Sequence, residues 1–462
     1  MAVEKAACLI QPRCYHAFSL PLKHTKLRRM HMSHALCPAT VRGFEPQAYH
    51  LDYIRCSIAT MGLTLFATLF AGLALSSPLR RAYGNSSLPP PLRFTSNGTF
   101  QISIFEDLHF GENAWDSWGP QQDINTVKVM NQVLDAETQQ LVVLNGDLIT
   151  GENAYLGNAT VKIDQIVAPL LARGLTWAST YGNHDSQYNL SRHAILAREH
   201  RWPRHARTQQ MVHGPDAGVS NYYLPVYPST GDTDEPCLLL WFFDSRGGFH
   251  FQQRNASSGA HIGQPDWVTR ASSPAFVHIP TNASQAAQMS LAGIDPRRQP
   301  GINDDAPNLA QQAQGWCEDG SNGPECVYGG QDVPFMRALA STKGLMAVFS
   351  GHDHGDTWCY KWDGVLPGME VEGDGVNLCF GQHSGYGGYG NWVRGSRQVL
   401  VEGGRLGEGE VETWIRLESG EVVGRVGLNA TYGADVYAET PDTMTHCPTC
   451  NYSVITNMPG TK

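Results

Sequence analysis

Short apolar runs recur through the middle of the chain, and Gly or polar residues follow each of them. Runs of this length, rich in β-branched and aromatic residues and bounded in this way, predict buried strands. Five such runs are 101–105, 141–144, 175–178, 275–277 and 345–349. The spacing of apolar residues over Asp123–Glu137 and Asn158–Arg173 predicts two helices between them. The pattern therefore indicates an α/β fold.

The C-terminal part of the chain predicts further strands at Gln398–Val401, Glu412–Glu418 and Glu421–Val426. Ser419-Gly420 joins the last two, and a short Gly-containing turn between two such runs indicates a β-hairpin. In contrast, residues 247–320 are polar and rich in Gly, Pro, Asn and Gln, apart from the run before His278. We expect this stretch to form long loops, which commonly carry function.

The residues that follow the five runs are of the types that bind metals. In chain order they are Asp107-Leu-His109, Gly146-Asp147, Gly182-Asn183-His184-Asp185, His278 and Gly351-His352-Asp353-His354. In open α/β sheets, ligands bind beyond the carboxyl ends of the strands, so we expect these side chains to share one site. Asp oxygens and His nitrogens suit Zn, Fe or Mn. The candidates are too many for one tetrahedral ion and fit two.

Two cations in one site make a defined chemistry possible. Metal ions about 3.5–4 Å apart can share a bridging carboxylate and generate a hydroxide at neutral pH. That hydroxide can attack phosphorus in line while the cations stabilise the displacement. The ligand types therefore favour hydrolysis of a phosphate ester.

Taken in order, the blocks DxH, GD, GNHD, a lone His and GHDH resemble the calcineurin-like metallophosphoesterase superfamily. They span about Gln101 to His354. The later runs Phe380–Gly390 and Trp392–Arg397 resemble the purple-acid-phosphatase-like proteins of fungi and plants, and this likeness covers most of residues 96–430. The resemblance implies a four-layer α/β/β/α sandwich, in which two packed sheets are flanked by helices.

The resemblance also implies a role for each candidate. Asp147 would bridge two cations, and His184, which binds no metal in the family, would stand beside the substrate phosphate as an acid or charge stabiliser. The other candidates would divide into one set for each cation: Asp107, His109 and His354 for the first, and Asn183, His278 and His352 for the second.

Two positions depart from the purple enzymes of this family. Those enzymes carry a Tyr three residues after the bridging Asp and a residue other than His two after the first Asp. Here the two positions hold Thr150 and His109. The Fe(III)–tyrosinate pair that gives the purple colour is therefore not expected, and the identity of the two metals, divalent ions or Fe, Zn or Mn, stays open.

Three neighbours of the candidates need separate interpretation. Asp185 either caps the helix that follows or supports a metal ligand from behind. Asp353 is expected to face away from the metals. His383, in the Gly-rich run, either contacts substrate or shapes the loop, whose glycines permit turns with positive φ.

The charge of the chain argues against nucleic acid as a partner. The net charge is −10, and the residues from Ser77 onward include 25 Lys/Arg against 40 Asp/Glu. An acidic catalytic region repels a polyanion. We expect a small phosphate ester or a phosphoprotein as substrate.

The N-terminal region is different, since residues 1–60 hold eight Lys/Arg and three Asp/Glu. The uncharged stretch Gly62–Leu75 is too short for an ordinary membrane span of about 20 residues and suits a signal-peptide core. We expect a signal peptide at 61–76, a translation start near Met61, and a gene-model extension at 1–60. Alternatively, Ser57–Ser77 is a signal anchor behind a cytosolic tail, and only then is the protein held at a membrane.

Glycosylation sequons favour the secretory pathway over a third interpretation, a mitochondrial presequence within residues 5–42. Asn-x-Ser/Thr sites accept N-glycans in secreted proteins. Eight occur, at Asn85, Asn97, Asn158, Asn189, Asn255, Asn282, Asn429 and Asn451. We therefore expect a secreted glycoprotein.

The 11 cysteines fit an oxidising compartment. Cys317–Cys326 and Cys359–Cys379 are the expected disulfides. Cys237 begins an apolar run and is expected to be a packed thiol. Cys447 and Cys450 have CxxC spacing and are expected to form a terminal clip.

The sequence thus predicts a domain order and a reaction. A Pro-rich linker at 77–95 is expected before a phosphoesterase domain at 96–433 and a tail at 434–462. The expected reaction is hydrolysis of a phosphomonoester by a hydroxide that bridges the two metals. Two alternatives stay open: a phosphodiesterase or nucleotidase with the same metals, and a secreted binding protein that keeps metals for structure only.

Overall fold

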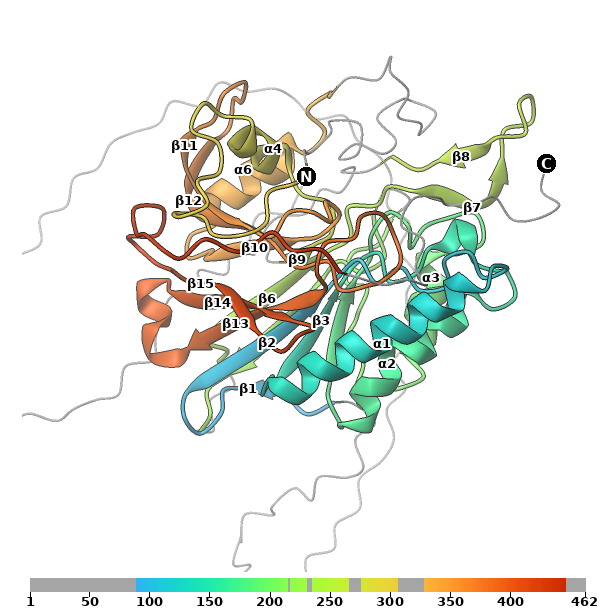
Figure 1. The fold of residues 1–462 in the computed structure, drawn as a ribbon, viewed down its shortest axis with the longest axis horizontal. Helices are drawn as coiled ribbons and strands as arrows, with labels where there is room; N and C mark the ends of the chain where they lie inside the picture. The colour runs from blue at the N-terminus through green and yellow to red at the C-terminus, as the bar shows by residue number, and fades with distance from the viewer. Residues whose placement is uncertain (1–88, 215–216, 231–234, 266–275, 306–327, 446–462) are drawn as a thin grey trace, which may run out of the picture. The chain divides into compact units, whose positions relative to one another are not determined.

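The computed structural model describes residues 89–214, 217–230, 235–265, 276–305 and 328–445. Within them, two large β-sheets pack face to face and helices cover their outer faces (Figure 1). The predicted signal peptide, the N-terminal extension and most of the linker lie outside the described residues. So do Cys317, Cys326, Cys447 and Cys450.

One sheet has six strands in the order β15-β14-β13-β2-β3-β4. Their bounds are β2 Thr99–Phe105, β3 Leu141–Asn145, β4 Trp177–Thr180, β13 Gly395–Glu402, β14 Val411–Leu417 and β15 Val422–Leu428. Strands β2, β3 and β4 are parallel, whereas β13, β14 and β15 pair antiparallel. The predicted hairpin at Ser419-Gly420 is confirmed, with Gly420 at a φ of 89°.

The other sheet has seven strands in the order β1-β5-β6-β9-β10-β12-β11. Their bounds are β1 Leu92–Arg93, β5 Tyr222–Tyr227, β6 Leu238–Phe243, β9 Phe276–Val277, β10 Ala347–Ser350, β11 Cys359–Val365 and β12 Glu372–Phe380. Strands β6, β9, β10 and β12 are parallel to their neighbours in this series. The predicted disulfide Cys359–Cys379 is confirmed and joins β11 to β12.

The alternation of side chains along the strands builds the layers. In β3, Leu141 and Val143 lie in the core between the sheets, whereas Val142 and Leu144 lie beneath helices. The helices α1 (Trp118–Ala136), α2 (Lys162–Ala172) and α3 (Arg192–Glu199) cover the six-stranded sheet. The helices α4 (Asn282–Gln288) and α6 (Val333–Ser341) cover the seven-stranded sheet. The predicted four-layer α/β/β/α sandwich is confirmed.

Some sequence predictions need correction. Helix α1 begins at Trp118, earlier than predicted, because Pro120 is tolerated in a first turn, where no N–H is needed. The polar stretch 247–320 is not all loop: it contains α4 and a two-stranded sheet of β7 (Phe249–Arg254) and β8 (His261–Gly263). The strand β7 is largely exposed and lacks the apolar alternation that would have predicted it.

Both predicted flanking segments contribute to the fold. At the end of the predicted linker, β1 pairs with β5, and Phe94 is buried in the core between the sheets. In the predicted tail, Thr443 accepts a hydrogen bond from the Val393 N–H, and the Thr445 hydroxyl donates one to Glu418. Among the described residues, no helix is long and apolar enough to cross a membrane.

Candidate metal centre

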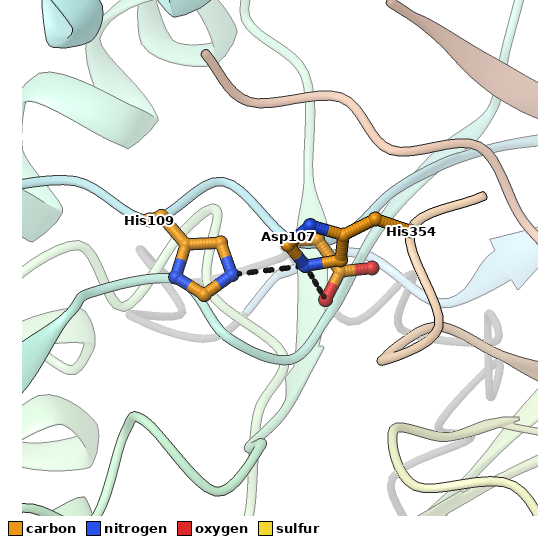
Figure 2. A group of neighbouring side chains, drawn as sticks. All are labelled: Asp107, His109 and His354. Atoms are coloured by element: carbon orange, nitrogen blue, oxygen red, sulfur yellow. Dashed lines mark hydrogen bonds and ion pairs between the residues drawn. The ribbon is translucent and has the colours of Figure 1, made fainter. Parts of the chain in front are cut away.

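Two groups of three side chains could each hold a metal ion. In the first group, the ligand atoms of Asp107, His109 and His354 lie within 4.8 Å of one another (Figure 2). The Nε2 atoms of His109 and His354 are 3.2 Å apart, and His354 Nε2 is 3.5 Å from Asp107 Oδ1. All three side chains are buried. They follow β2 and β10, so the first group joins the two sheets.

The second group contains Asp147, His278 and His352, whose ligand atoms also lie within 4.8 Å of one another. It too joins the sheets, because Asp147 follows β3 whereas His278 and His352 follow β9 and β10. His278 Nε2 is 2.9 Å from Asp147 Oδ2. The predicted two-metal centre is thus matched by two candidate sites of buried Asp and His side chains, a donor set that suits Zn, Fe or Mn.

The carboxylates of the two groups lie between imidazoles of both. Asp147 Oδ2, which is 2.9 Å from His278 Nε2, is also 4.0 Å from His109 Nε2 in the first group. Asp107 Oδ1 is 3.7 Å from His278 Nε2 in the second group. The two candidate sites are therefore adjacent, as a two-metal phosphoesterase centre requires.

Asn183 provides an independent test of whether cations fit here. It is completely buried, yet neither its Oδ1 nor its Nδ2 has a hydrogen-bond partner among the described residues. A buried amide without a partner is costly and calls for a missing ligand. The next residue lies at the second group, since the His184 N–H donates to Asp147 Oδ1 at 2.8 Å. An Asn oxygen left without a partner here fits a cation.

The rings of three candidate ligands are each oriented by a contact at Nδ1, the nitrogen that faces away from the centre. His109 Nδ1 lies 2.9 Å from Thr150 Oγ1. His278 Nδ1 lies 2.9 Å from the Asn145 carbonyl oxygen, and His354 Nδ1 lies 2.8 Å from that of Tyr389. A carbonyl oxygen can only accept, so Nδ1 carries a proton in these two rings, and in the neutral ring Nε2 is the lone-pair donor toward the centre.

The backbone of the centre is strained. Asp107, His109, Asp147 and His352 have φ values of 52°, 50°, 48° and 76°. Residues other than Gly adopt positive φ only at a cost, and such residues concentrate at functional sites. Hydrogen bonds hold the turns, for example from the His109 N–H to Asp147 O at 2.9 Å.

Comparison with known families agrees with this geometry. A family model described as calcineurin-like phosphoesterase matches residues 104–356, which is more than half of the chain and includes all five polar runs. The chain belongs to the calcineurin-like phosphoesterase family. It is accordingly a metallophosphoesterase, as the sequence predicted.

Two named relatives of this phosphoesterase are a plant protein called probably inactive and a yeast protein called a phosphatase. "Probable inactive purple acid phosphatase 29" of Arabidopsis thaliana is 26% identical over 352 residues, which cover 71% of this chain and 84% of the plant protein. Phosphatase DCR2 of Saccharomyces cerevisiae is 26% identical over 353 residues, which cover 71% of this chain and 55% of the yeast protein.

Solved structures also match this phosphoesterase. A dimetal phosphatase from Danio rerio aligns over 71% of this chain and 98% of its own length, with 12% identity and a TM-score of 0.37. Purple acid phosphatase PPD1 from yellow lupin seeds aligns over 76% of this chain and 57% of its own length, with 11% identity and a TM-score of 0.31.

His184 lies at the edge of the phosphoesterase centre and belongs to neither group. Its side chain is 21% exposed, and its Nδ1 donates to Glu152 Oε1 at 2.8 Å. Burial lowers the pKa of His184, but the carboxylates of Glu152 and Asp147 outweigh this and raise it to about 10. Glu152 lies in η1 (Gly151–Asn153), the turn that follows the Asp147 block.

The three neighbouring residues can now be placed. Asp185 does not cap the following helix, because Ser191 does so. Instead its carboxylate accepts from the N–H groups of Gly182, Leu148 and Ile149 and ties two polar runs together. Asp353 is buried and belongs to neither group. His383 is only 1% exposed and its Nε2 lies 3.0 Å from the Gly387 carbonyl, which supports the loop interpretation.

Several residues that surround the centre were not predicted from the sequence. Glu152 orients His184, Tyr389 holds His354, and the Asn145 carbonyl holds His278. Asn145 Nδ2 in turn donates to the buried carboxylate of Glu106 at 2.9 Å. Burial raises the pKa of Glu106 well above its usual range. Only the polar character of Glu106 and Asn145 at strand ends could have pointed to them.

Proposed function

We propose that this chain is a secreted phosphatase that hydrolyses phosphomonoesters at the two-metal centre. In this proposal Asp147 would bridge two cations, and His184 would assist the leaving group without binding metal. The remaining ligands form two sets: Asp107, His109 and His354 for the first cation, and Asn183, His278 and His352 for the second.

The observation that carries the proposal is the position of Asp147. Its Oδ2 lies between His278 Nε2 at 2.9 Å and His109 Nε2 at 4.0 Å, so one carboxylate faces both groups. The buried amide of Asn183, next to His184, has no hydrogen-bond partner in the part of the chain that the structure describes, which supports a ligand role for it in the second set. When bound, two such cations would lower the pKa of bound water and neutralise charge on the phosphoryl oxygens.

The protein's own contribution to the reaction lies in His184 and Glu152. With Nδ1 bound to Glu152, His184 keeps a fixed ring orientation at the edge of the centre. Its Nε2–H is then the group that can donate a proton or hydrogen bond to a leaving oxygen. Acid assistance of this kind contributes about 10²–10⁴-fold to rate.

Names of the relatives favour a phosphatase but differ on activity. The yeast relative is called a phosphatase, whereas the plant relatives are called probable inactive purple acid phosphatases. A chain kept only as a metal-binding protein has no use for an imidazole that binds no metal and is held by a carboxylate. The His184–Glu152 pair therefore favours catalysis here. A phosphodiesterase or nucleotidase remains the second candidate function, because it would use the same centre.

Secretion rests on the sequence and on where the sequons lie. Asn97, Asn158 and Asn255 are exposed, so a glycan could be attached to each without unfolding the domain. Their exposure, together with the apolar stretch Gly62–Leu75, supports passage through the secretory pathway.

The test combines metal analysis with two substrates. Protein purified from the medium of a secreting host should carry two metal ions per chain. It should hydrolyse p-nitrophenyl phosphate faster than bis-p-nitrophenyl phosphate. A preference for the diester would instead indicate a phosphodiesterase or nucleotidase. Bound metals without turnover of either ester would indicate a binding protein that keeps metals for structure only.

A further inference from the structure

The Gly-rich run Phe380–Gly390 forms a wall against the first group. The N–H groups of Ser384 and Gly385 donate to the carbonyl oxygens of Glu106 and Asp107, each at 3.1 Å. A Cβ at Gly385 would lie 2.3 Å from the Leu108 carbonyl oxygen. One at Gly388, which has a φ of 74°, would lie 2.5 Å from His354 Cε1. Glycine is therefore required where the run touches the ligand candidates.

The imidazole of His354 contacts two rings of this run, stacked on Tyr389 and tilted against His383. The Tyr389 ring lies 4.0 Å from it, centroid to centroid, at an interplanar angle of 11°. The His383 ring lies 3.8 Å from it at 39°. The ring edge that carries Nε2 points toward Asp107 and His109 (Figure 2).

Tyr389 also binds the backbone and the other edge of His354. Its carbonyl oxygen accepts from His354 Nδ1 at 2.8 Å, and its hydroxyl oxygen accepts from the His354 N–H at 3.0 Å. The hydroxyl hydrogen goes to the carboxylate of Asp305. Asp305 lies on a separate segment, which is tied to the same block by the bond from the Asp304 N–H to Gly355 O at 3.1 Å.

We propose that Tyr389 is a positioning residue that fixes the His354 imidazole and thereby sets the affinity of the first group for its cation. Its ring prevents rotation of the imidazole, and its hydroxyl anchors the backbone of His354 to Asp305. The hydroxyl also lies 3.3 Å from the carbonyl oxygen of His352 in the second group, whereas the ring stacking and the bond to Nδ1 are made with His354. The inference rests on the ligand sets of the proposed function, but not on the choice of substrate.

Two substitutions separate the two contributions of Tyr389. Tyr389→Phe keeps the ring and the carbonyl but removes the hydroxyl bonds to His354, Asp305 and the His352 carbonyl. Tyr389→Leu keeps only the carbonyl and opens one face of the imidazole. Substitution of residues that orient a metal ligand commonly costs 10–100-fold in affinity. We expect about a 10-fold loss at the first group for Tyr389→Phe and a larger loss for Tyr389→Leu.

The experiment measures Co²⁺ binding by titration calorimetry and by absorption in two single-site backgrounds. His278→Ala leaves the first group intact, and His109→Ala leaves the second. Tyr389→Leu should weaken Co²⁺ binding in the His278→Ala background much more than in the His109→Ala background, where only the hydroxyl contact with the His352 carbonyl is lost. Tyr432→Phe is the matched control, since this buried Tyr donates to the Cys359 carbonyl at 2.8 Å, outside either group.

Three readouts decide between positioning and general structure. Equal losses in both backgrounds, or a loss for Tyr432→Phe as large as that for Tyr389→Phe, would overturn the proposal. So would unchanged affinity of Tyr389→Leu at the first group. If the wild type turns over no phosphate ester but Tyr389→Leu still weakens Co²⁺ binding more at the first group than at the second, the proposed function fails and the positioning role stands.

Discussion

His109 and Thr150 are joined by a contact of 2.9 Å between Nδ1 and Oγ1. They are the two positions at which the chain departs from the purple enzymes, and the structure shows that the departures form one pair. A Tyr at position 150 would meet the His109 ring, which lies at that position's side chain. The hydroxyl of Thr150 is instead small enough to hold the imidazole from behind. The two departures are therefore in direct contact in the folded chain.

Thr150 should control metal affinity at the first group. Thr150→Val removes the partner of His109 Nδ1 but keeps the shape of the side chain. It should lower the affinity of the first group for its cation by about 10–100-fold. Thr150→Ser, which restores a hydroxyl, should recover most of that loss. Competition with a chelator of known affinity measures metal binding by both variants. Equal metal affinities of Thr150→Val and Thr150→Ser would show that the contact between His109 and Thr150 is unimportant.

The sequence could predict which strands carry the site, because each ligand candidate directly follows an apolar run. The side chains after β2, β3, β9 and β10 were found in this way. The apolar runs alone could not show that these strands belong to two different sheets. The meeting of His109 with His354, which lie 245 residues apart in the chain, depends on how the sheets stack.

Residues that support the site were beyond the reach of sequence patterns. Glu152 lies in a short 3₁₀ turn with no apolar period, and any acidic residue there would look like a solvated one. The positive φ values of Asp107 and His352 are also invisible, since neither Asp nor His marks such a conformation as Gly does. These features arise from tertiary contacts, such as the bond from the His352 N–H to Asp107 Oδ2 at 3.1 Å.

Asp147 and His184 should separate metal binding from chemistry. Asp147→Asn removes a negative charge from between both groups, so it should lower the metal content and abolish turnover together. His184→Ala should keep both metals while kcat falls by roughly 10²-fold or more, as for loss of a general acid. Elemental analysis beside steady-state kinetics measures this. Loss of metal in His184→Ala would identify His184 as a ligand and overturn its assigned role.

The leaving group should reveal the contribution of Glu152. Glu152→Gln keeps a hydrogen-bond partner for His184 Nδ1 but removes the charge that favours a protonated ring. The loss in kcat should be large for alkyl phosphates, whose leaving oxygen needs a proton, and small for p-nitrophenyl phosphate. Asp164→Asn is a suitable control, because this carboxylate pairs with Arg198 at the surface. A loss of the same size for both esters would contradict the acid role.

Glu112 should make the stability of the domain depend on pH. Its side chain is 3% exposed, and it accepts a hydrogen bond from the Gly388 N–H at 2.6 Å. Burial raises the pKa of Glu112 from 4.5 to about 7, despite this hydrogen bond. The folded state therefore holds this proton more tightly than the unfolded state. The stabilisation is present below pH 4.5 and is lost as the pH rises through about 7.

Glu112→Gln should remove this dependence, because the amide keeps the acceptor for the Gly388 N–H and carries no charge. A pKa difference of this size corresponds to on the order of 3 kcal/mol of unfolding free energy. Urea unfolding of metal-free protein at pH 5 and pH 8 measures it. The variant should gain stability over the wild type as the pH rises between these values.

Other buried carboxyls, such as Asp185, titrate in the same range and contribute equally to both proteins, so only the difference between the two proteins reports on Glu112. If that difference is the same at both pH values, Glu112 ionises in the folded state as it does in water.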